Sequence, residues 1–432
     1  MSEGISSNVP REASTAITPP TAVTPAPSQR LMSLDALRGF DMFWIIGADA
    51  LVEALNRMAH PRGDQTGFSL IGSIAHQLQH CAWAGFHFED LIFPLFVFMV
   101  GVSLVFSLTK TIRQEGRAVA VQRVFRRGIL LFLLGLFYSG GFSNNWPDMR
   151  LMGVLNRIAL CYFFAGLIFC FCNLRAMVVI VATLLFSYWA LLTFVPIRNI
   201  QLEKTALAKL AKQRGVPNDA KALFYSTTER VTGHFEKGFD LSDHLDFQYL
   251  PGRKYDTFFD PEGLLSTLPA IASCLLGVFA GLLLSNPSYK DQQKVICLIA
   301  AGLVLVNVGW LWNLQFPVIK KIWTSSFVLV AGGYSALLLG IFYLVVDVWK
   351  YQKWCRPFVW MGMNSITIYM VTNILGGGEW EKLGNRLVGG NIRDFCNAHW
   401  FGSGDLLVAV AGLALAFWLV NFLYRRKVFL RL

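Results

Sequence analysis

The chain has 432 residues, of which 54% are hydrophobic and 15% are charged, and its mean hydropathy is +0.48. A soluble domain carries about 25% charged residues, so this composition excludes an ordinary soluble protein. The net charge of +11 does not require a nucleic-acid partner, because basic residues collect on the cytoplasmic loops of membrane proteins. We therefore expect an all-α, polytopic helical bundle in a lipid bilayer, with no nucleic acid among its partners.

Residues 1–30 are rich in Ser, Thr, Ala and Pro and lack the apolar core of a signal peptide. We interpret them as a disordered leader, and residues 31–432 as one transmembrane domain. Apolar runs long enough to cross a hydrocarbon core predict about ten membrane helices. Their expected ranges are 36–56, 88–109, 125–141, 153–172, 174–195, 264–285, 295–315, 325–348, 357–376 and 405–424.

Clusters of Lys and Arg recur in alternate connections between these ranges, which assigns those connections to the cytoplasm. An even number of helices then places both termini in the cytoplasm. The loop around residue 80 and the long loop at about 196–262 are expected on the external face, where the long loop would form a small cap.

The expected first helix is unusually charged. On a continuous helix Asp35, Arg38, Asp49 and Glu53 lie within about 60° of one another. An unpaired charge at mid-membrane costs about 3 kcal/mol, so this stripe must face the bundle interior or water. Asp35 and Arg38 are expected to pair near the inner surface. Asp49 lies about 21 Å further along the helix, near the outer surface and without a local partner, which makes it a functional candidate.

A polar segment runs directly into the second expected helix, between Gln79 and Leu104. It begins with His80 and Trp83 and reaches Asp90 before the apolar run. A histidine and acids at the lip of a membrane helix are typical of a reaction site. They are equally compatible with a wet interfacial loop that precedes an ordinary helix.

Other polar residues flank the remaining helices, and each has a structural alternative such as a buried ion pair, helix capping or interfacial anchoring. No CxxC spacing supports a metal site, and we predict no metal. The candidates in this group are Arg150, Arg157, Asp260, Glu262, Lys320, Lys321 and Asn364.

Six motifs follow one another in a fixed order, and in combination they resemble the heparan-α-glucosaminide N-acetyltransferase family, most of all its shorter bacterial members. The resemblance covers the chain from about residue 31 to the end. The motifs are SLDALRG (33–39), HCAWAGFHFEDLIFPLFVFMVG (80–101), RLMGVLNRI (150–158), DPEGLLST (260–267), KKIWTSSF (320–327) and GMNS (362–365).

The resemblance implies a polytopic enzyme that uses cytosolic acetyl-CoA as donor substrate and acetylates the amine of a terminal glucosamine across the membrane. It further implies a bacterial inner-membrane location and a homodimer. The family's catalytic histidine precedes the W-x-G and D-x-x-F-P elements, and His80 matches it. Asp49 stands where the animal enzyme has an assisting asparagine, which is a departure from the family pattern.

We expect His80 to act as general base or to carry the acetyl group itself, and Asp49 to orient it. The remaining candidates are assigned to the two substrates. Expected contacts to the sugar are Trp83, Asp90, Asp260, Glu262 and Asn364, and expected contacts to CoA are Arg38, Arg150, Arg157, Lys320 and Lys321.

Two other functions fit the same residues. A transporter of sugars or lipids would line its path with them, although the inverted repeats common in transporters are not evident. A membrane O-acyltransferase would use His80 in the same way, with a glycan hydroxyl as acceptor.

Overall fold

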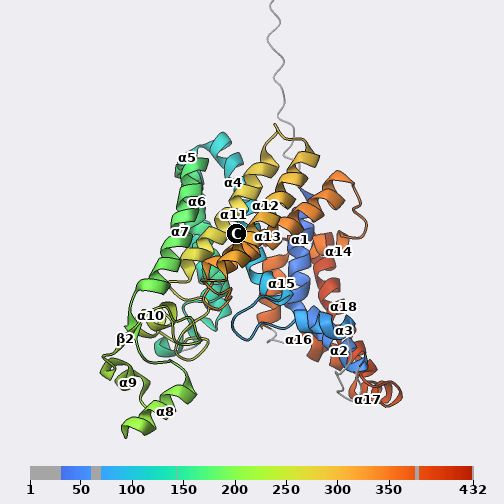
Figure 1. The fold of residues 1–432 in the computed structure, drawn as a ribbon. Coiled ribbons are helices and arrows are strands. Elements are labelled where there is room, and N and C mark those ends of the chain that lie inside the picture. Colours follow the sequence, from blue (N-terminus) through green and yellow to red (C-terminus); the bar gives the residue numbers. More distant parts are fainter. Residues whose placement is uncertain (1–30, 60–69, 144, 375–378, 431–432) are drawn as a thin grey trace, which may run out of the picture. The chain divides into compact units, whose positions relative to one another are not determined.

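The computed structural model describes residues 31–59, 70–143, 145–374 and 379–430, apart from the side chains of Asp49, Ala59, Phe142, Asn373 and Glu379. The expected leader at 1–30 lies outside these residues. Met32–Leu432 form one compact unit, and its described part is almost entirely helical (Figure 1).

Seven helices of the described residues are long and apolar enough to cross a membrane, which confirms a multi-pass helical membrane protein. The expected count of ten is not confirmed. The seven are α4 (Phe88–Glu115), α6 (Val154–Phe171), α7 (Leu174–Phe194), α11 (Thr267–Ser285), α12 (Asp291–Trp312), α13 (Ser325–Phe342) with the π-helical continuation η4 (Tyr343–Val348), and α18 (Ser403–Arg425).

Two of the other expected spans are helical but differ from a continuous apolar helix. α5 (Arg117–Tyr138) covers most of the expected range 125–141, but its first half carries several arginines. The expected range 357–376 is divided between α14 (Arg356–Met363) and α15 (Ser365–Ile374). Asn364 separates them because its backbone leaves helical geometry, with φ −118° and ψ 22°.

The first expected helix is not continuous, so the prediction of one helix over 36–56 is wrong. The chain forms α1 (Met32–Phe43), the π-helical segment η1 (Trp44–Ala48) and α2 (Asp49–Ala59). Gly47 has φ 121° and ψ 26°, a conformation that glycine adopts at little cost and that other residues avoid. The bend at Gly47 separates the two halves of the predicted charged stripe.

The two halves of that stripe have different partners. Asp35 and Arg38 form the expected pair, with 3.7 Å between carboxylate and guanidinium. Glu53 is exposed and pairs with Arg57 of α2 at 2.8 Å, and Arg57 also reaches Asp405 of α18 at 3.4 Å. Glu53 therefore belongs to a surface network that ties α2 to α18.

Small residues bring α1 into direct backbone contact with α14. A Cβ atom added at Gly39 would lie 1.7 Å from the carbonyl oxygen of Phe358, and one at Gly362 would lie 1.9 Å from that of Asp35. Close approach through small residues is a common mode of packing between membrane helices. It fixes the position of α1 beside the cavity described below.

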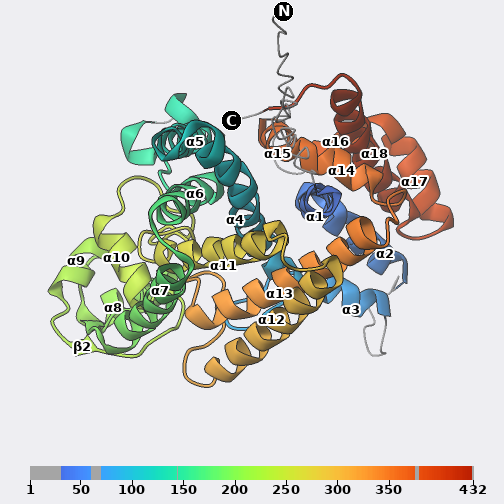
Figure 2. The same ribbon diagram turned by 90° about the horizontal axis from the view of Figure 1, so that it is seen from above.

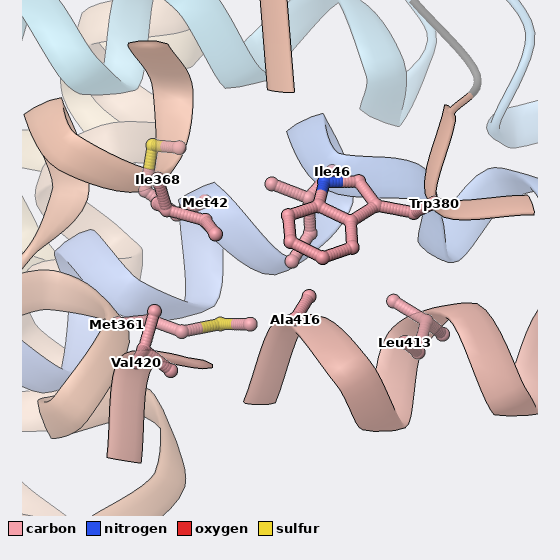
Figure 3. Close-up of a cluster of buried hydrophobic side chains, with 8 residues drawn as sticks. All are labelled: Met42, Ile46, Met361, Ile368, Trp380, Leu413, Ala416 and Val420. Atoms are coloured by element: carbon pink, nitrogen blue, oxygen red, sulfur yellow. The ribbon is translucent and has the colours of Figure 1, made fainter. Parts of the chain in front are cut away.

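A buried apolar cluster joins the first segment to the C-terminal helices α14, α15, α16 (Glu379–Val388) and α18. Figure 3 shows its side chains converging on one volume. The indole nitrogen of Trp380 donates to the Thr372 hydroxyl at 2.9 Å, which satisfies its polar atom. The cluster consists of Met42, Ile46, Met361, Ile368, Trp380, Leu413, Ala416 and Val420.

α4 packs against α1, α5, α6, α11 and α13 (Figure 2). α11 lies against α4 and α6, α12 lies against α13, and α1 contacts both α4 and α13. Short helices complete this part of the chain. They are α3 (Leu70–Gln77), the 3-10 turns η2 (Gly141–Ser143) and η3 (Trp146–Asp148), and α17 (Gly390–His399).

The long loop after α7 folds around a small apolar cluster of its own, which includes Ile200, Leu207 and Phe224. β1 and β2 pair antiparallel, with Ile197 opposite Val231. The elements are β1 (Ile197–Arg198), α8 (Lys204–Arg214), α9 (Ala220–Ser226), β2 (Arg230–Val231) and α10 (Leu241–Tyr249).

Candidate active site

The described residues enclose a cavity of about 610 Å³ where the N-terminal ends of α4 and α13 approach α6 and the long loop. One part of its wall is charged, and another part is apolar, with Phe93, Phe96 and Ile158 among its members. A concave site that combines apolar walls with a few convergent polar groups is the usual form of a small-molecule site. The ionisable residues of the wall are His80, Cys81, Glu89, Asp90, Arg150, Tyr255, Glu262, Lys320, Lys321 and Tyr369.

His80 and Asp90 form the centre of the charged part. Nδ1 of His80 lies 3.1 Å from Oδ1 of Asp90; the His80 side chain is 59% exposed, whereas that of Asp90 is 1% exposed. Oδ2 of Asp90 accepts the main-chain N–H groups of Cys81 at 3.2 Å and His87 at 3.1 Å. An ionised Asp90 accepts a hydrogen bond from Nδ1–H. In its neutral form His80 then has the lone pair on Nε2 available for chemistry.

The start of α4 explains why Asp90 is held in place. His87 is the N-cap residue with extended backbone angles (φ −109°, ψ 166°), and Asp90 is the third residue of the helix. A side chain at this position that accepts the N-cap N–H forms one half of a capping box. A carboxylate there also interacts favourably with the positive end of the helix dipole. The HFED sequence thus both starts the helix and fixes the carboxylate.

Lys320 reaches the same pair from a distant segment. The loop of His80 runs alongside residues 318–319, through a β-bridge between Ala84 and Ile319 and a 2.8 Å hydrogen bond from Gly85 to Val318. The next residue is Lys320, whose Nζ lies 3.2 Å from Nδ1 of His80 and 3.4 Å from Oδ1 of Asp90. The KKIW motif is therefore part of the site that contains His80.

Arg150 connects the cavity wall to two acids before α11. Its guanidinium donates to both oxygens of Asp260 at 2.8 and 2.7 Å and to Glu262 at 2.7 Å. It also lies 5.1 Å from the ring centroid of Tyr255. Burial raises the pKa of Glu262, against the effect of the neighbouring arginines. Glu262 lines the cavity, whereas Asp260 supports Arg150 from behind it.

Two further predicted residues tie the long loop to the cavity wall. The indole nitrogen of Trp83 donates to the carbonyl of Phe235 at 2.6 Å. Nζ of Lys321 lies 2.9 Å from Oδ2 of Asp256. Both Trp83 and Lys321 line the cavity, so their contacts fix part of its wall to the segment between α7 and α11.

Arg157 and Arg38 do not line the cavity. Arg157 is fully buried in α6, where it donates to the Ser266 hydroxyl and to the carbonyl of Gly263, the latter at 3.4 Å. Arg38 donates to the Ser103 hydroxyl at 2.6 Å and thereby links α1 to α4. Both arginines therefore make structural contacts between elements.

Asn364 and Asp49 also do not appear on the described wall. Asn364 is buried, and its amide donates back to the carbonyl of Trp360 in α14 at 3.2 Å. Asp49 is the first residue of α2, and its side chain lies outside what the structure describes.

Several wall residues were not assigned a site role from the sequence. Glu89 precedes Asp90 in the same motif, and Ser365 follows Asn364 in GMNS, so their motifs could have indicated them. Tyr255 and Tyr369 lie in segments without a recognisable pattern. Only the fold brings them to the cavity.

Cys81, His87 and Asp90 place potential metal-ligand atoms within 4.8 Å of one another. Hydrogen bonds already engage both oxygens of Asp90, with His80, Lys320 and two main-chain N–H groups as partners. Burial, assisted by the Asp90 charge, raises the pKa of the Cys81 thiol to about 11. A protonated thiol is a poor ligand and a poor nucleophile. The cluster is better explained as the frame that holds Asp90.

No model of a known protein family matches the chain. Two curated proteins do, both named heparan-alpha-glucosaminide N-acetyltransferase. The mouse (Mus musculus) protein is 29% identical over 329 residues, which cover 69% of this chain and 49% of the relative. The human (Homo sapiens) protein is 28% identical over 329 residues, which cover 68% and 48%. The chain is therefore similar to the heparan-alpha-glucosaminide N-acetyltransferases.

This similarity confirms the resemblance that the ordered motifs indicated. The chain spans about half the length of the heparan-alpha-glucosaminide N-acetyltransferases that it matches.

Proposed function

We propose that this protein transfers the acetyl group of acetyl-CoA to the amine of a glucosamine-type sugar, with His80 as the catalytic residue. The observation that carries this proposal is the contact of His80 with the buried Asp90 on the wall of a cavity of about 610 Å³. The two similar proteins are named as N-acetyltransferases of a glucosaminide, which supports the acetyl group and the amino sugar. The thioester of acetyl-CoA is the donor substrate.

The reaction needs one base. The acceptor amine attacks the carbonyl carbon of the thioester, and a C–N bond forms while Nε2 of His80 takes the proton of the amine. The C–S bond then breaks, and the sulfur takes the proton back from the imidazolium to leave as the CoA thiol. In a two-step variant, Nε2 attacks the thioester carbonyl and the C–S bond breaks, so that CoA leaves as a thiolate. The amine then attacks the acetyl-imidazolium, the bond to Nε2 breaks, and the proton of the amine goes to the thiolate. Both routes use Nε2, the nitrogen that does not face Asp90.

Asp90 takes the orienting role that the sequence assigned to Asp49. A carboxylate bonded to Nδ1 fixes the tautomer of the imidazole and stabilises the imidazolium that forms during transfer. Asp90 is buried and fully engaged, which suits this task better than a contact to a sugar hydroxyl. The expectation that Asp49, at the junction of η1 and α2, also assists His80 stays a prediction.

The cavity wall has groups that suit each of the two substrates. Its apolar wall suits the uncharged arm that carries the thioester, and its charged wall suits a sugar. Two carboxylates neutralise Arg150, so we assign it to holding Glu262 in the wall. Lys321 has one carboxylate partner and a partly exposed side chain, and it remains the candidate for a CoA phosphate.

The orientation of the protein belongs to the same proposal. We infer cytoplasmic termini, an external acceptor site and a bacterial inner-membrane location from the basic connections and the family resemblance. The resemblance also implies a homodimer. Reconstitution in vesicles with acetyl-CoA on one side and glucosamine on the other tests the sidedness, and mass photometry in detergent tests the dimer.

Purified protein with labelled acetyl-CoA and a panel of acceptors tests the reaction. The panel contains glucosamine, glucose and N-acetylglucosamine. We expect an amide product from glucosamine and no product from the sugars that offer only hydroxyl groups. Ester products from glucose would favour an O-acyltransferase instead. Uptake of labelled glucosamine into vesicles without acetyl-CoA would favour a transporter.

A further inference from the structure

Lys320 touches both members of the proposed catalytic pair. Its Nζ is 3.2 Å from Nδ1 of His80 and 3.4 Å from Oδ1 of Asp90. Its side chain is 22% exposed, so solvent screens the ammonium charge only in part. A charge at such a distance changes which protonation state of an ionisable group is favoured.

We propose that Lys320 is a positioning residue that sets the protonation state of His80. Its ammonium group holds the Asp90 carboxylate on one side and opposes the imidazolium form of His80 on the other. The neutral imidazole is the form that accepts a proton from the amine. This inference rests on the proposed acetyl transfer at His80.

Charged groups of α4 favour the ammonium form of Lys320. Asp90 pairs with it directly, and the main-chain carbonyl of Glu89 accepts from Nζ at 3.5 Å. Burial lowers the pKa of Lys320, whereas the charges of Asp90, Glu89 and Glu262 oppose that change. The negative charges of these carboxylates thus favour the ammonium form of Lys320 beside the imidazole of His80.

The other titratable groups near His80 belong to its own loop and to α3. Cys81 follows it directly, with a thiol that stays neutral at physiological pH because its pKa is raised to about 11. Nδ1 of His87 lies 2.7 Å from the carbonyl of Gln79. The ring of His76 lies 4.4 Å from that of His87. Among the lysine and arginine side chains of the described residues, Lys320 is the one whose nitrogen lies close to the His80 ring, 3.2 Å from Nδ1.

The test compares the pH profiles of acetyl transfer in the wild type, Lys320→Met and Lys320→Arg, with Lys321→Met as the matched charge deletion. On the acid side, the rate falls when the catalytic base is protonated. Without Lys320 only the Asp90 charge acts on the imidazole, and it favours the imidazolium. We expect the acid limb of Lys320→Met to move up by about one pH unit. It should stay near the wild-type position in Lys320→Arg and in Lys321→Met.

Two outcomes would overturn the inference. One is an unmoved acid limb in Lys320→Met together with a raised KM for acetyl-CoA, which would make Lys320 a donor contact, as its motif suggested. The other is an equal shift in Lys321→Met. That result would show that the loss of any positive charge near the cavity moves the acid limb, so that the position of Lys320 would not matter. If the wild type transfers no acetyl group at any pH, the proposed function fails instead.

A second readout does not depend on activity. Diethyl pyrocarbonate modifies the neutral imidazole, and mass spectrometry of the peptide that carries His80 reports its extent at each pH. The midpoint of His80 modification should move to higher pH in Lys320→Met, even in a protein that has lost turnover. An identical midpoint in folded Lys320→Met and wild type would contradict the inference.

Discussion

Nδ1 of His80 lies 3.1 Å from Oδ1 of Asp90, so a side chain that is 59% exposed is tied to one that is 1% exposed. The difference in burial separates two tasks. The exposed imidazole can reach a substrate in the cavity, while the buried carboxylate is held by the first turn of α4. The imidazole that we propose as the base therefore lies at the cavity and is held by a buried carboxylate.

Asp90→Asn should slow acetyl transfer with little change in the KM for acetyl-CoA. The amide keeps the size of the carboxylate but removes the negative charge that stabilises the imidazolium and selects the tautomer. We expect kcat to fall by roughly 100-fold or more, measured with labelled acetyl-CoA. Glu53→Gln removes a carboxylate in the exposed network of α2 and should leave kcat within about twofold of wild type. Similar losses in both variants would contradict the role of Asp90.

Arg150→Met should destabilise the fold. The change leaves the carboxylates of Asp260 and Glu262 without their guanidinium partner, and breaking a buried pair in this way costs about 3 kcal/mol. Thermal unfolding in detergent should show a lower Tm. Adding Glu262→Gln removes one of the two orphaned charges, so the double variant should be more stable than the sum of the single effects. Strict additivity of the two changes would exclude the coupling seen between these side chains.

Stability should fall as pH rises from about 4 to 7, and Asp246 should account for part of the fall. Burial raises the pKa of this α10 carboxyl to about 7, although the main-chain N–H groups of Leu264 and Asp260 oppose the change. An aspartate in the unfolded chain ionises near pH 4. Between these values the folded state binds a proton that the unfolded state has released, so the stabilisation present at low pH is lost as pH rises.

Asp246→Asn should flatten this part of the curve of Tm against pH. The slope that remains comes from other buried carboxyls, such as Asp240, whose pKa is raised to about 6. Parallel curves for the variant and the wild type would show that Asp246 does not titrate in this range.

Gly47→Ala should lower the stability by about 1 kcal/mol, because a side chain at this backbone angle is strained. A Cβ atom at Gly47 has no neighbour within 4 Å, so the strain is the main cost. Gly390 offers the matched control. An added Cβ is equally free there, and Gly390 begins α17 without a positive φ. Gly390→Ala should be neutral or stabilising, and equal losses in both variants would argue against strain at Gly47.

The sequence sufficed for the helical membrane class, because apolar runs in seven segments reflect the burial of whole helices in lipid. It did not predict the interruptions. The run over 36–56 is apolar enough to suggest one helix, but the backbone at Gly47 leaves helical geometry, and hydropathy does not report backbone angles. The sequence also did not predict the interruption at Asn364, where the helix stops between two segments of ordinary composition.

The candidate site was predicted in part. His80, Asp90, Arg150 and Lys320 were recognised as candidates from motifs, but their partners were not. Lys320 and His80 are 240 positions apart, and a β-bridge between Ala84 and Ile319 joins their segments. Hydropathy and spacing carry no information about such a bridge. We propose Asp90 for the orienting role that was expected of Asp49, because the capping of α4, a local effect, holds its carboxylate against the loop of His80.

Acetyl transfer by purified wild type and His80→Ala, with labelled acetyl-CoA and glucosamine, is the measurement that we would make first. We predict N-acetylglucosamine from the wild type and at least a roughly 100-fold loss in His80→Ala, with the same Tm in both proteins. A folded His80→Ala protein that retains full turnover would contradict the assignment of His80 as the catalytic residue.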